Sequence, residues 1–424
     1  MAEGKYRLKE TDISDFKYKA LNWAASFEVA CFLDSNNYPD KYSAFDSAIA
    51  AGTKAEISAQ GNAFSKLQFF LDANESYAFG YLSYDLKNEI EELSSENPDN
   101  LRFASLYFFV PEFLLFIKGK ELIIEADEPD EVFKAIQNTV LPKLEVGFKG
   151  NIKSKLNKGK YLETIRKIKR NIAKGDIYEA TFCQEFFSEN CSINPVQAFT
   201  KLNQISPTPF AAFFKHKENY IISASPERFL RKQGNKLISQ PIKGTIERGE
   251  TPEEDEEMRH QLKNSIKEQS ENVMIVDLVR NDLTKSASEG TVEVEELYGI
   301  YSFKQVHQMI STVVCKANKN IKHIRILKNT FPPGSMTGAP KIRAMQLTEQ
   351  YEQTKRGVYS GSIGYFSPAG DFDFSVVIRT ILYNADKKYL SYQTGSAITF
   401  DSDPKKEYEE CLLKAEAIRE VLGG

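Results

Sequence analysis

The chain has 424 residues, enough to bury a large core in one big domain or in two to three smaller ones. Hydrophobic residues make up 41% and charged residues 27%, which is ordinary for a soluble globular protein. The formal net charge of −4 gives no electrostatic argument for binding nucleic acid or an anionic membrane. We therefore expect neither among its partners.

Signals for export, membrane spans and zinc are absent from the sequence. The start, MAEGKYRLKETD, is charged and lacks the apolar core of a signal peptide. The longest apolar run, residues 104–117, contains Pro111 and Glu112 and is shorter than the roughly 20 residues that span a bilayer, so we expect buried strands there. The five cysteines form no CxxC pair, which favours free thiols in a reducing cytoplasm. The four histidines show no metal-binding spacing.

Residues 1–140 combine short strand-like runs with turn clusters. Residues 26–33, SFEVACFL, are largely apolar and end at a turn, and residues 79–84 and 106–110 are further strand candidates rich in aromatic side chains. Lysines and glycines gather in residues 141–160, which indicates a solvated connection and a boundary near residue 150. We expect an N-terminal region, 1–150, and a catalytic region, 151–424.

Helices and strands alternate after this boundary. Apolar residues recur every three or four positions over residues 162–172, which predicts an amphipathic helix. Residues 255–284 predict one long core helix, and the acidic run at 253–257 suits its N-terminus. A last helix is expected over residues 404–422, with its cap at 401–402. Strands are expected at residues 178–187, 210–214, 220–223, 359–366, 373–382 and 388–399.

Several carboxylates stand at positions that suit a cation site. Glu407, Glu410 and Lys414 occupy positions i, i+3 and i+7 of the last helix, so they share one face. Glu271 lies at the edge of the apolar segment MIVDLV. Magnesium takes oxygen ligands and usually only one or two protein carboxylates. The alternative is an exposed charged stripe and an acidic residue at the rim of a core.

Two short segments offer reactive groups. Lys243 lies in PIKGT, and a lysine held among apolar groups loses charge stability, so that its pKa falls and its amine becomes a nucleophile. Glu227 lies in the turn SPERF and could act as a general acid. The alternatives are a lysine directed to the surface and a solvated carboxylate.

Residues 333–341, PGSMTGAPK, look like a phosphate loop but do not match one. Gly334 and Gly338 are one residue too close, and Ala339-Pro340 replaces the GK pair, so no nucleotide is expected. A loop of small residues before a helix can still offer amide N–H groups and hydroxyls to a carboxylate.

Taken together and in this order, these segments resemble the chorismate-utilising enzymes, a family that includes anthranilate synthase component I, aminodeoxychorismate synthase component I, and the isochorismate and salicylate synthases. The similarity covers about residues 175–420. It implies an α+β fold of large antiparallel sheets packed as a sandwich, with helices outside and the site in a cleft. The matching segments are GDIYEATF (175–182), SPERF (225–229), PIKGT (241–245), SENVMIVDLVRNDL (270–283), GSMTGAPKIRAMQ (334–346), RGVYSGSIGYF (356–366), SVVIRT (375–380) and DSDPKKEYEE (401–410).

The resemblance implies roles for individual residues. Glu271 and Glu410, with Glu407 adjacent, resemble the family's Mg²⁺ ligands, and the metal would hold the ring carboxylate of chorismate. Arg379 suits a substrate carboxylate through its forked donors. The other positions that resemble substrate contacts or the pocket lining are Gly244, Thr245, His307, Ser335, Tyr359, Gly395, Ser396, Ala397 and Lys414, with His307 and Ser335 near the departing C4 hydroxyl or the ring.

The segment at residues 395–397 departs from the family's pattern. The family often has glycines in the matching loop, whereas Ser396 and Ala397 carry Cβ atoms that restrict backbone angles and close approach. We therefore expect this departure to affect substrate binding through the backbone N–H groups of the segment.

Residue 243 selects a branch of the family. Anthranilate synthases read PIAGT where this chain reads PIKGT, and the lysine form resembles the aminodeoxychorismate synthases. There the lysine attacks C2 of chorismate as the C4 hydroxyl leaves, helped by an acid at the position of Glu227, and ammonia then adds at C4 and expels the lysine. The resemblance implies amination at C4 for p-aminobenzoate and folate synthesis, with anthranilate synthase component I as the alternative.

Partners follow from the same resemblance. Ammonia is expected from a separate class I glutamine amidotransferase subunit, and a separate lyase would release p-aminobenzoate and pyruvate. The N-terminal region resembles the part of relatives that holds tryptophan, with Ser35, Pro209 and Phe210 as the nearest matches, although simple packing also explains them. A noncatalytic scaffold or small-molecule sensor with this fold is the alternative from a different class.

Overall fold

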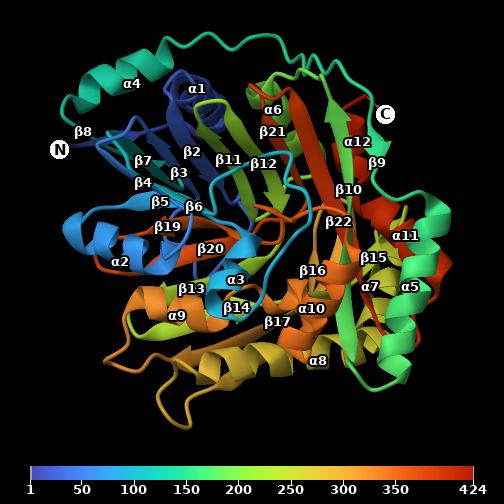
Figure 1. Ribbon diagram of the computed structural model, residues 1–424. Coiled ribbons are helices and arrows are strands. Elements are labelled where there is room, and N and C mark those ends of the chain that lie inside the picture. The colour runs from blue at the N-terminus through green and yellow to red at the C-terminus, as the bar shows by residue number, and fades with distance from the viewer. Residues whose placement is uncertain (1, 424) are drawn as a thin grey trace.

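Two large antiparallel sheets form the centre of the computed structural model, which describes residues 2–423 (Figure 1). The first sheet has 12 strands. They are β1 (Ala2–Arg7), β2 (Val29–Asp34), β3 (Ser47–Ala51), β7 (Phe113–Lys118), β8 (Glu121–Ala126), β9 (Lys153–Ser154), β10 (Glu179–Glu189), β11 (Phe210–His216), β12 (Asn219–Ser225), β18 (Gly338–Ala339), β21 (Thr380–Asn384) and β22 (Tyr389–Ile398). Their order is β1-β8-β7-β3-β2-β11-β12-β21-β22-β10-β18, with β9 paired to β10.

The second sheet has 10 strands and is also antiparallel. They are β4 (Ala55–Ala59), β5 (Ala78–Leu82), β6 (Leu106–Val110), β13 (Arg228–Gln233), β14 (Lys236–Gln240), β15 (Ile242–Glu247), β16 (Glu293–Ser302), β17 (Val306–Lys316), β19 (Ser362–Phe366) and β20 (Phe372–Val376). Their order is β15-β17-β14-β13-β20-β19-β5-β6-β4, and β16 pairs with β17.

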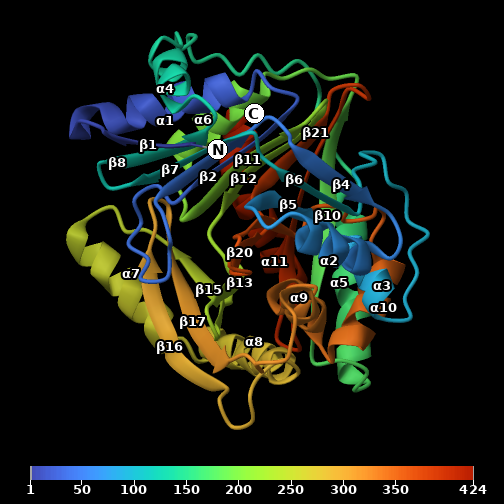
Figure 2. The same ribbon diagram turned by 90° about the vertical axis from the view of Figure 1, so that its left-hand side faces the viewer.

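Helices cover the outer faces of both sheets. They are α1 (Ile13–Ala24), α2 (Ala63–Ala73), α3 (Lys87–Ile90), α4 (Pro129–Gln137), α5 (Lys158–Ala173), α6 (Pro195–Ile205), α7 (Pro252–Asn264), α8 (Ile266–Thr284), α9 (His323–Thr330), α10 (Lys341–Tyr351), α11 (Pro404–Lys414) and α12 (Glu416–Val421). Helices α1, α4 and α6 pack on the first sheet, and α8 packs along β15 and β17 of the second (Figures 1 and 2). The predicted α+β sandwich with helices outside is confirmed.

Successive side chains of a strand point to opposite faces of the sheet, so one strand contributes to two hydrophobic cores. On β2, Val29 and Cys31 point into the core between the sheets, whereas Ala30 and Phe32 point into the core beneath the helices. Because both faces of this strand are buried, its sequence reads as a nearly continuous apolar run rather than an alternating one.

The expected boundary at residue 150 lies between α4 and α5. Each sheet nevertheless takes strands from both sides of it, so the N-terminal strands complete the sheets that carry the later ones. All five cysteines are free and buried, as predicted. Within residues 2–423, no helix is long and apolar enough to cross a membrane.

Three predicted elements are each divided in the structure. The helix expected over 255–284 is two, because Ser265 adopts an extended backbone and its side chain caps α8. The strand expected over 373–382 is interrupted at Arg379, whose φ of +53° is left-handed. The last helix also breaks into α11 and α12, and its cap is Asp403 rather than residues 401–402, since the Asp403 side chain accepts two backbone N–H bonds.

Candidate active site

A cavity of about 340 Å³ opens between the ends of the two sheets and helices α8 and α11. It brings together groups that lie far apart in the sequence, and both sheets contribute to its wall. The predicted residues that line it are Glu227, Lys243, Gly244, Thr245, Glu271, Ser335, Tyr359, Arg379, Gly395, Ser396, Ala397, Glu407, Glu410 and Lys414. All the predicted nucleophile, acid, ligand and substrate-contact positions except one therefore share a single site.

His307 is the exception, because it is not among the lining residues. Its neighbours on β17, Val306 and Gln308, do line the cavity, and alternation along a strand sends the side chain between them to the opposite face. There the ring is fully buried, with Nε2 2.9 Å from Asp255 Oδ1 and Nδ1 2.9 Å from Ser302 Oγ. The structure gives His307 a packing role against α7 in place of the predicted substrate contact.

The Lys243 amine does not lie among apolar groups alone. Its Nζ donates to Glu179 Oε1 at 2.7 Å, with both side chains buried. Burial lowers the pKa of Lys243, but the charges of Glu179 and Glu271 outweigh it and raise that pKa above its ordinary value. The predicted fall in pKa is wrong, because the sequence did not reveal the carboxylate opposite the amine.

Glu227 is held in the turn between β12 and β13, where it is 4% exposed. Burial raises the pKa of Glu227 to about 7, although the nearby positive charges of Lys243 and Lys414 oppose this rise. A carboxyl with such a pKa is protonated in a substantial fraction of molecules at neutral pH. The geometry therefore supports a proton donor facing the cavity.

Arg379 contributes a positive charge without a protein counterion. Among residues 2–423, no carboxylate forms an ion pair with its guanidinium, which lines the cavity. The left-handed backbone between β20 and β21 puts this side chain in the wall. A half-buried arginine without an ion-pair partner in residues 2–423 suits an anionic ligand, and its forked donors match a carboxylate.

The carboxylates expected to hold a metal come from two helices, α8 and α11, and face the same cavity. Burial raises the pKa of Glu271 to about 7. One oxygen of Glu407, Oε2, is buried without a hydrogen-bond partner. Glu410 pairs with Lys414 at 2.6 Å, and the charge of that lysine holds the pKa of Glu410 below its ordinary value. The site thus concentrates negative charge that a cation would compensate.

Lys267 lies beside these carboxylates and was not predicted. Its Nζ is 3.7 Å from both Glu268 Oε1 and Glu271 Oε1. Burial lowers the pKa of Lys267, yet the surrounding glutamates raise it overall. Over residues 2–423, no group of three or more His, Cys, Asp or Glu side chains that could hold a metal ion is assembled. The residues present fit a hard cation that takes two carboxylates and fills its other positions with water or ligand oxygens.

Residues 395–397 are part of strand β22 rather than the expected loop. Gly395, Ser396 and Ala397 pair with residues 183, 182 and 181 of β10 in regular register. A Cβ at Gly395 would lie 2.2 Å from the carbonyl oxygen of Phe182, so only glycine fits there. Ser396 and Ala397 carry no left-handed backbone, so their Cβ atoms do not strain the strand, and their effect on the approach of the substrate stays a prediction.

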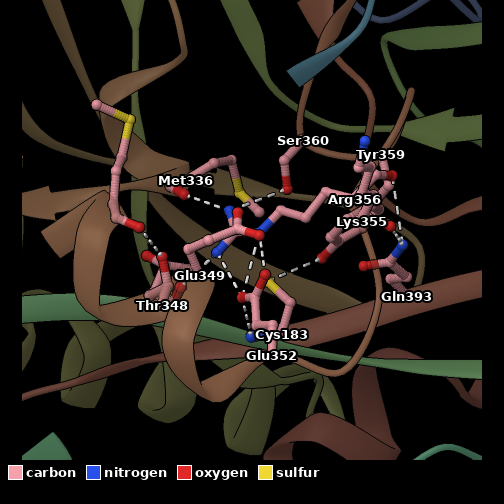
Figure 3. A network of polar contacts seen from close by, with 12 residues as sticks. Cys183, Met336, Thr348, Glu349, Glu352, Lys355, Arg356, Tyr359, Ser360 and Gln393 are labelled. Atoms are coloured by element: carbon pink, nitrogen blue, oxygen red, sulfur yellow. Dashed lines mark hydrogen bonds and ion pairs between the residues drawn. The ribbon is translucent and has the colours of Figure 1, made fainter. Parts of the chain in front are cut away.

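A buried ion pair supports the floor of the cavity and was not predicted. Figure 3 shows the Arg356 guanidinium between Met336 and Glu352. It donates to Glu352 Oε1 at 2.7 Å, to the Met336 carbonyl at 2.6 Å and to the Thr181 carbonyl at 2.7 Å. Met336 and Thr181 both line the cavity, so this one side chain ties two of its walls together.

The three residues expected in a tryptophan pocket also come together. Ser35, Pro209 and Phe210 line a second, smaller cavity of about 50 Å³, next to Arg228 and Asp373. The hydroxyl of Ser35 is buried there without a hydrogen-bond partner. Tryptophan binding at this place stays a prediction.

Comparison with known proteins agrees with this fold. Residues 28–420 match the family of chorismate binding enzymes, and the chain belongs to that family. It is 33% identical to aminodeoxychorismate synthase component 1 of Bacillus subtilis, over 81% of this chain and 76% of that protein. It is 42% identical to the probable chloroplastic aminodeoxychorismate synthase of Oryza sativa, over 63% of this chain, but spans only 30% of the length of that relative.

The family also contains neighbours with other names. The chain is 31% identical to anthranilate synthase component 1 of Aquifex aeolicus, over 81% of this chain and 73% of that protein. Among solved structures, anthranilate synthase component I from Streptococcus pneumoniae superposes with a TM-score of 0.77 at 24% identity, over 89% of this chain and 93% of that one. The menaquinone-specific isochorismate synthase of Escherichia coli gives 0.78 at 18% identity, over 99% and 94%. These structural matches establish the fold.

The ion pair beneath the cavity leads to a stability prediction. Arg356→Met leaves the Glu352 carboxylate buried without its ion-pair partner, so we expect the free energy of unfolding in urea to fall by about 3–5 kcal/mol. Arg356→Met combined with Glu352→Gln removes the lone charge and should recover part of that loss. Lys134→Met, which breaks an exposed ion pair with Glu131, serves as the control and should change little. An Arg356→Met variant as stable as the unmodified protein would contradict this role.

Proposed function

We propose that this chain aminates chorismate at C4, with ammonia as the nitrogen donor, to form 4-amino-4-deoxychorismate for p-aminobenzoate and folate synthesis. The observation that carries this proposal is the lysine at position 243, inside the cavity and beside the buried Glu227. The names of the Bacillus and Oryza relatives support the same activity. Anthranilate synthases have alanine at this position, which leaves C2 open to ammonia.

Each side chain takes one task in this reaction. The Arg379 guanidinium binds a carboxylate of chorismate and orients the ring. The Lys243 amine attacks C2 and shields that carbon from water and ammonia. Glu227 donates its proton to the C4 hydroxyl as it leaves. Ammonia then adds at C4 and expels the lysine.

A magnesium ion held by Glu271 and Glu410, with Glu407 adjacent, would polarise and position the ring carboxylate. The support for it is the unpartnered oxygen of Glu407 and the negative charge shared by the two helices. Tyr359, Ser335 and Thr245 line the remaining wall, and Lys414 donates to the Gly395 carbonyl at 3.0 Å.

Ammonia would come from a separate glutamine amidotransferase of class I. The designation component 1 of the Bacillus relative supports an enzyme of more than one subunit. The free buried cysteines support a reducing, cytoplasmic setting.

Product analysis tests the reaction itself. Incubation with chorismate, Mg²⁺ and an ammonium salt should yield 4-amino-4-deoxychorismate, which becomes p-aminobenzoate only after a lyase is added. Lys243→Ala should abolish this product, whereas Lys263→Ala, an exposed lysine on α7, should not. Anthranilate formed without lyase would favour the anthranilate synthase alternative. Binding of chorismate without any turnover would favour a sensor.

The raised pKa of Glu227 predicts the pH dependence. The carboxyl must carry its proton to assist the leaving hydroxyl, so kcat/KM should fall as the pH rises through about 7. Glu227→Gln cannot donate a proton, and we expect it to lose about 10²- to 10⁴-fold in kcat. Its kcat/KM should also no longer fall as the pH rises through about 7. A full-rate Glu227→Gln enzyme with an unchanged pH profile would remove Glu227 from the mechanism.

The metal proposal is tested by binding rather than by activity alone. Calorimetry with Lys243→Ala, which binds chorismate without turnover, should show Mg²⁺ binding in the presence of chorismate. Glu271→Gln or Glu410→Gln should weaken this binding by about tenfold or more, because a carboxylate ligand is lost. Glu409→Gln, an exposed neighbour on α11, is the matched control. Equal Mg²⁺ affinity in all variants would exclude these ligands.

A further inference from the structure

Glu179 stands directly behind the proposed nucleophile. It begins strand β10, and its Oε1 accepts the hydrogen bond from Lys243 Nζ at 2.7 Å. Its side chain is 2% exposed and that of Lys243 is 10% exposed, so water does not screen the pair. Within residues 2–423, this is the one side-chain hydrogen bond that the Lys243 amine makes. Glu179 is absent from the cavity lining, so it acts on the cavity through the lysine.

The local backbone holds this glutamate in place. Glu179 pairs with Ala339 of the short strand β18, and its neighbour Ala180 pairs with Gly338 and with Ile398 of β22. A Cβ at Gly338 would lie 2.2 Å from the carbonyl oxygen of Glu179, and its φ is +151°. Only glycine permits this close approach. The segment GSMTGAP, which resembled a phosphate loop, therefore serves to close the sheet around Glu179.

Several charged groups face the Lys243 amine from the elements around it. They are Glu179 on β10, Glu268 and Glu271 on α8, Glu227 in the turn before β13, and Glu410 on α11. Of these, Glu179 is the one in hydrogen-bond contact. The free site consequently favours the ammonium form, which has no lone pair and cannot attack carbon. The nucleophile needs a group that removes its proton.

We propose that Glu179 is a positioning residue, which holds the Lys243 ammonium in the free enzyme and receives its proton when the amine attacks chorismate. This inference rests on the proposed C4 amination. An N–H bond of the ammonium breaks, its electron pair stays on nitrogen, and the proton moves to Glu179 Oε1. The distance of 2.7 Å allows this transfer without movement of either side chain.

The remaining steps conserve atoms and charge. The nitrogen lone pair forms the bond to C2, both conjugated ring double bonds shift one position toward C4, and the C4–O bond breaks as Glu227 protonates the leaving hydroxyl to water. Ammonia then bonds to C4, both double bonds shift back, and the C2–N electrons return to the lysine as a neutral amine. The new ammonium at C4 gives one proton back to Glu227. Glu179 returns its proton to Lys243, which restores the resting pair.

Competitive labelling with acetic anhydride measures the charge state of Lys243 in the free enzyme. The rate of acetylation, followed by mass spectrometry of the peptide with Lys243, rises with pH as the neutral amine forms. In Glu179→Gln we expect the midpoint to fall by about one pH unit or more, which means about tenfold more acetylation at a fixed pH below both midpoints. Glu185→Gln, a buried glutamate on the same strand that binds Tyr389, is the control and should leave the midpoint unchanged.

Turnover provides the second readout. Without its proton acceptor, Glu179→Gln should lose about 100-fold in kcat, although its lysine is more often neutral. A merely structural defect would not make the amine easier to deprotonate and the reaction slower together. Glu179→Asp keeps the charge, so it should keep the raised midpoint and recover part of the turnover.

The outcomes separate this inference from the proposed function. An unchanged midpoint in Glu179→Gln overturns the charge-holding role, and unchanged turnover overturns the proton transfer. If the midpoint in Glu179→Asp also shifts to that of a free, exposed lysine, the pocket is disrupted. This result also counts against the inference. If Lys243→Ala retains full activity, the proposed function fails, and the proton transfer fails with it, whatever the labelling shows.

Discussion

Charge compensation in a space that excludes water is the constraint on which the site depends. A buried charge is costly unless an opposite charge or a proton neutralises it. Glu179 compensates the charge of Lys243, and Glu352 compensates the charge of Arg356. Within residues 2–423, Glu227 has no ion-pair partner, and burial raises its pKa to about 7. The Arg379 guanidinium likewise forms no ion pair with any carboxylate of residues 2–423.

Both sheets are needed to meet this constraint. Lys243 lies on β15 of the second sheet, whereas Glu179 lies on β10 of the first, and their contact joins the two sheets. Helices α8 and α11 add their glutamates from two further directions. The N-terminal strands carry none of the residues that line the cavity, but they extend both sheets, and so they stabilise the frame that holds these side chains.

Much of the fold and most of the site could be predicted from short segments. Strand β6 and helix α5 follow from local apolar patterns, and all but one of the residues that the resemblance assigned to catalysis, metal binding or substrate contact line the cavity. The helix and the strand that the structure divides were harder to predict, because Ser265 and Arg379 interrupt apolar patterns that continue on both sides of them. His307 was misplaced because its own segment does not show which face of β17 is turned toward the cavity.

The sequence by itself determined the class of fold, the family, and the kinds of group available: a lysine, a carboxyl, an arginine and several helix-borne glutamates. Only the tertiary structure decided their charge states and their partners. The reason is that a pKa depends on burial and on charges a few ångströms away, and these come from segments that are distant in the chain. Glu179 and Lys243 are separated by 64 positions and meet only when the two sheets pack together.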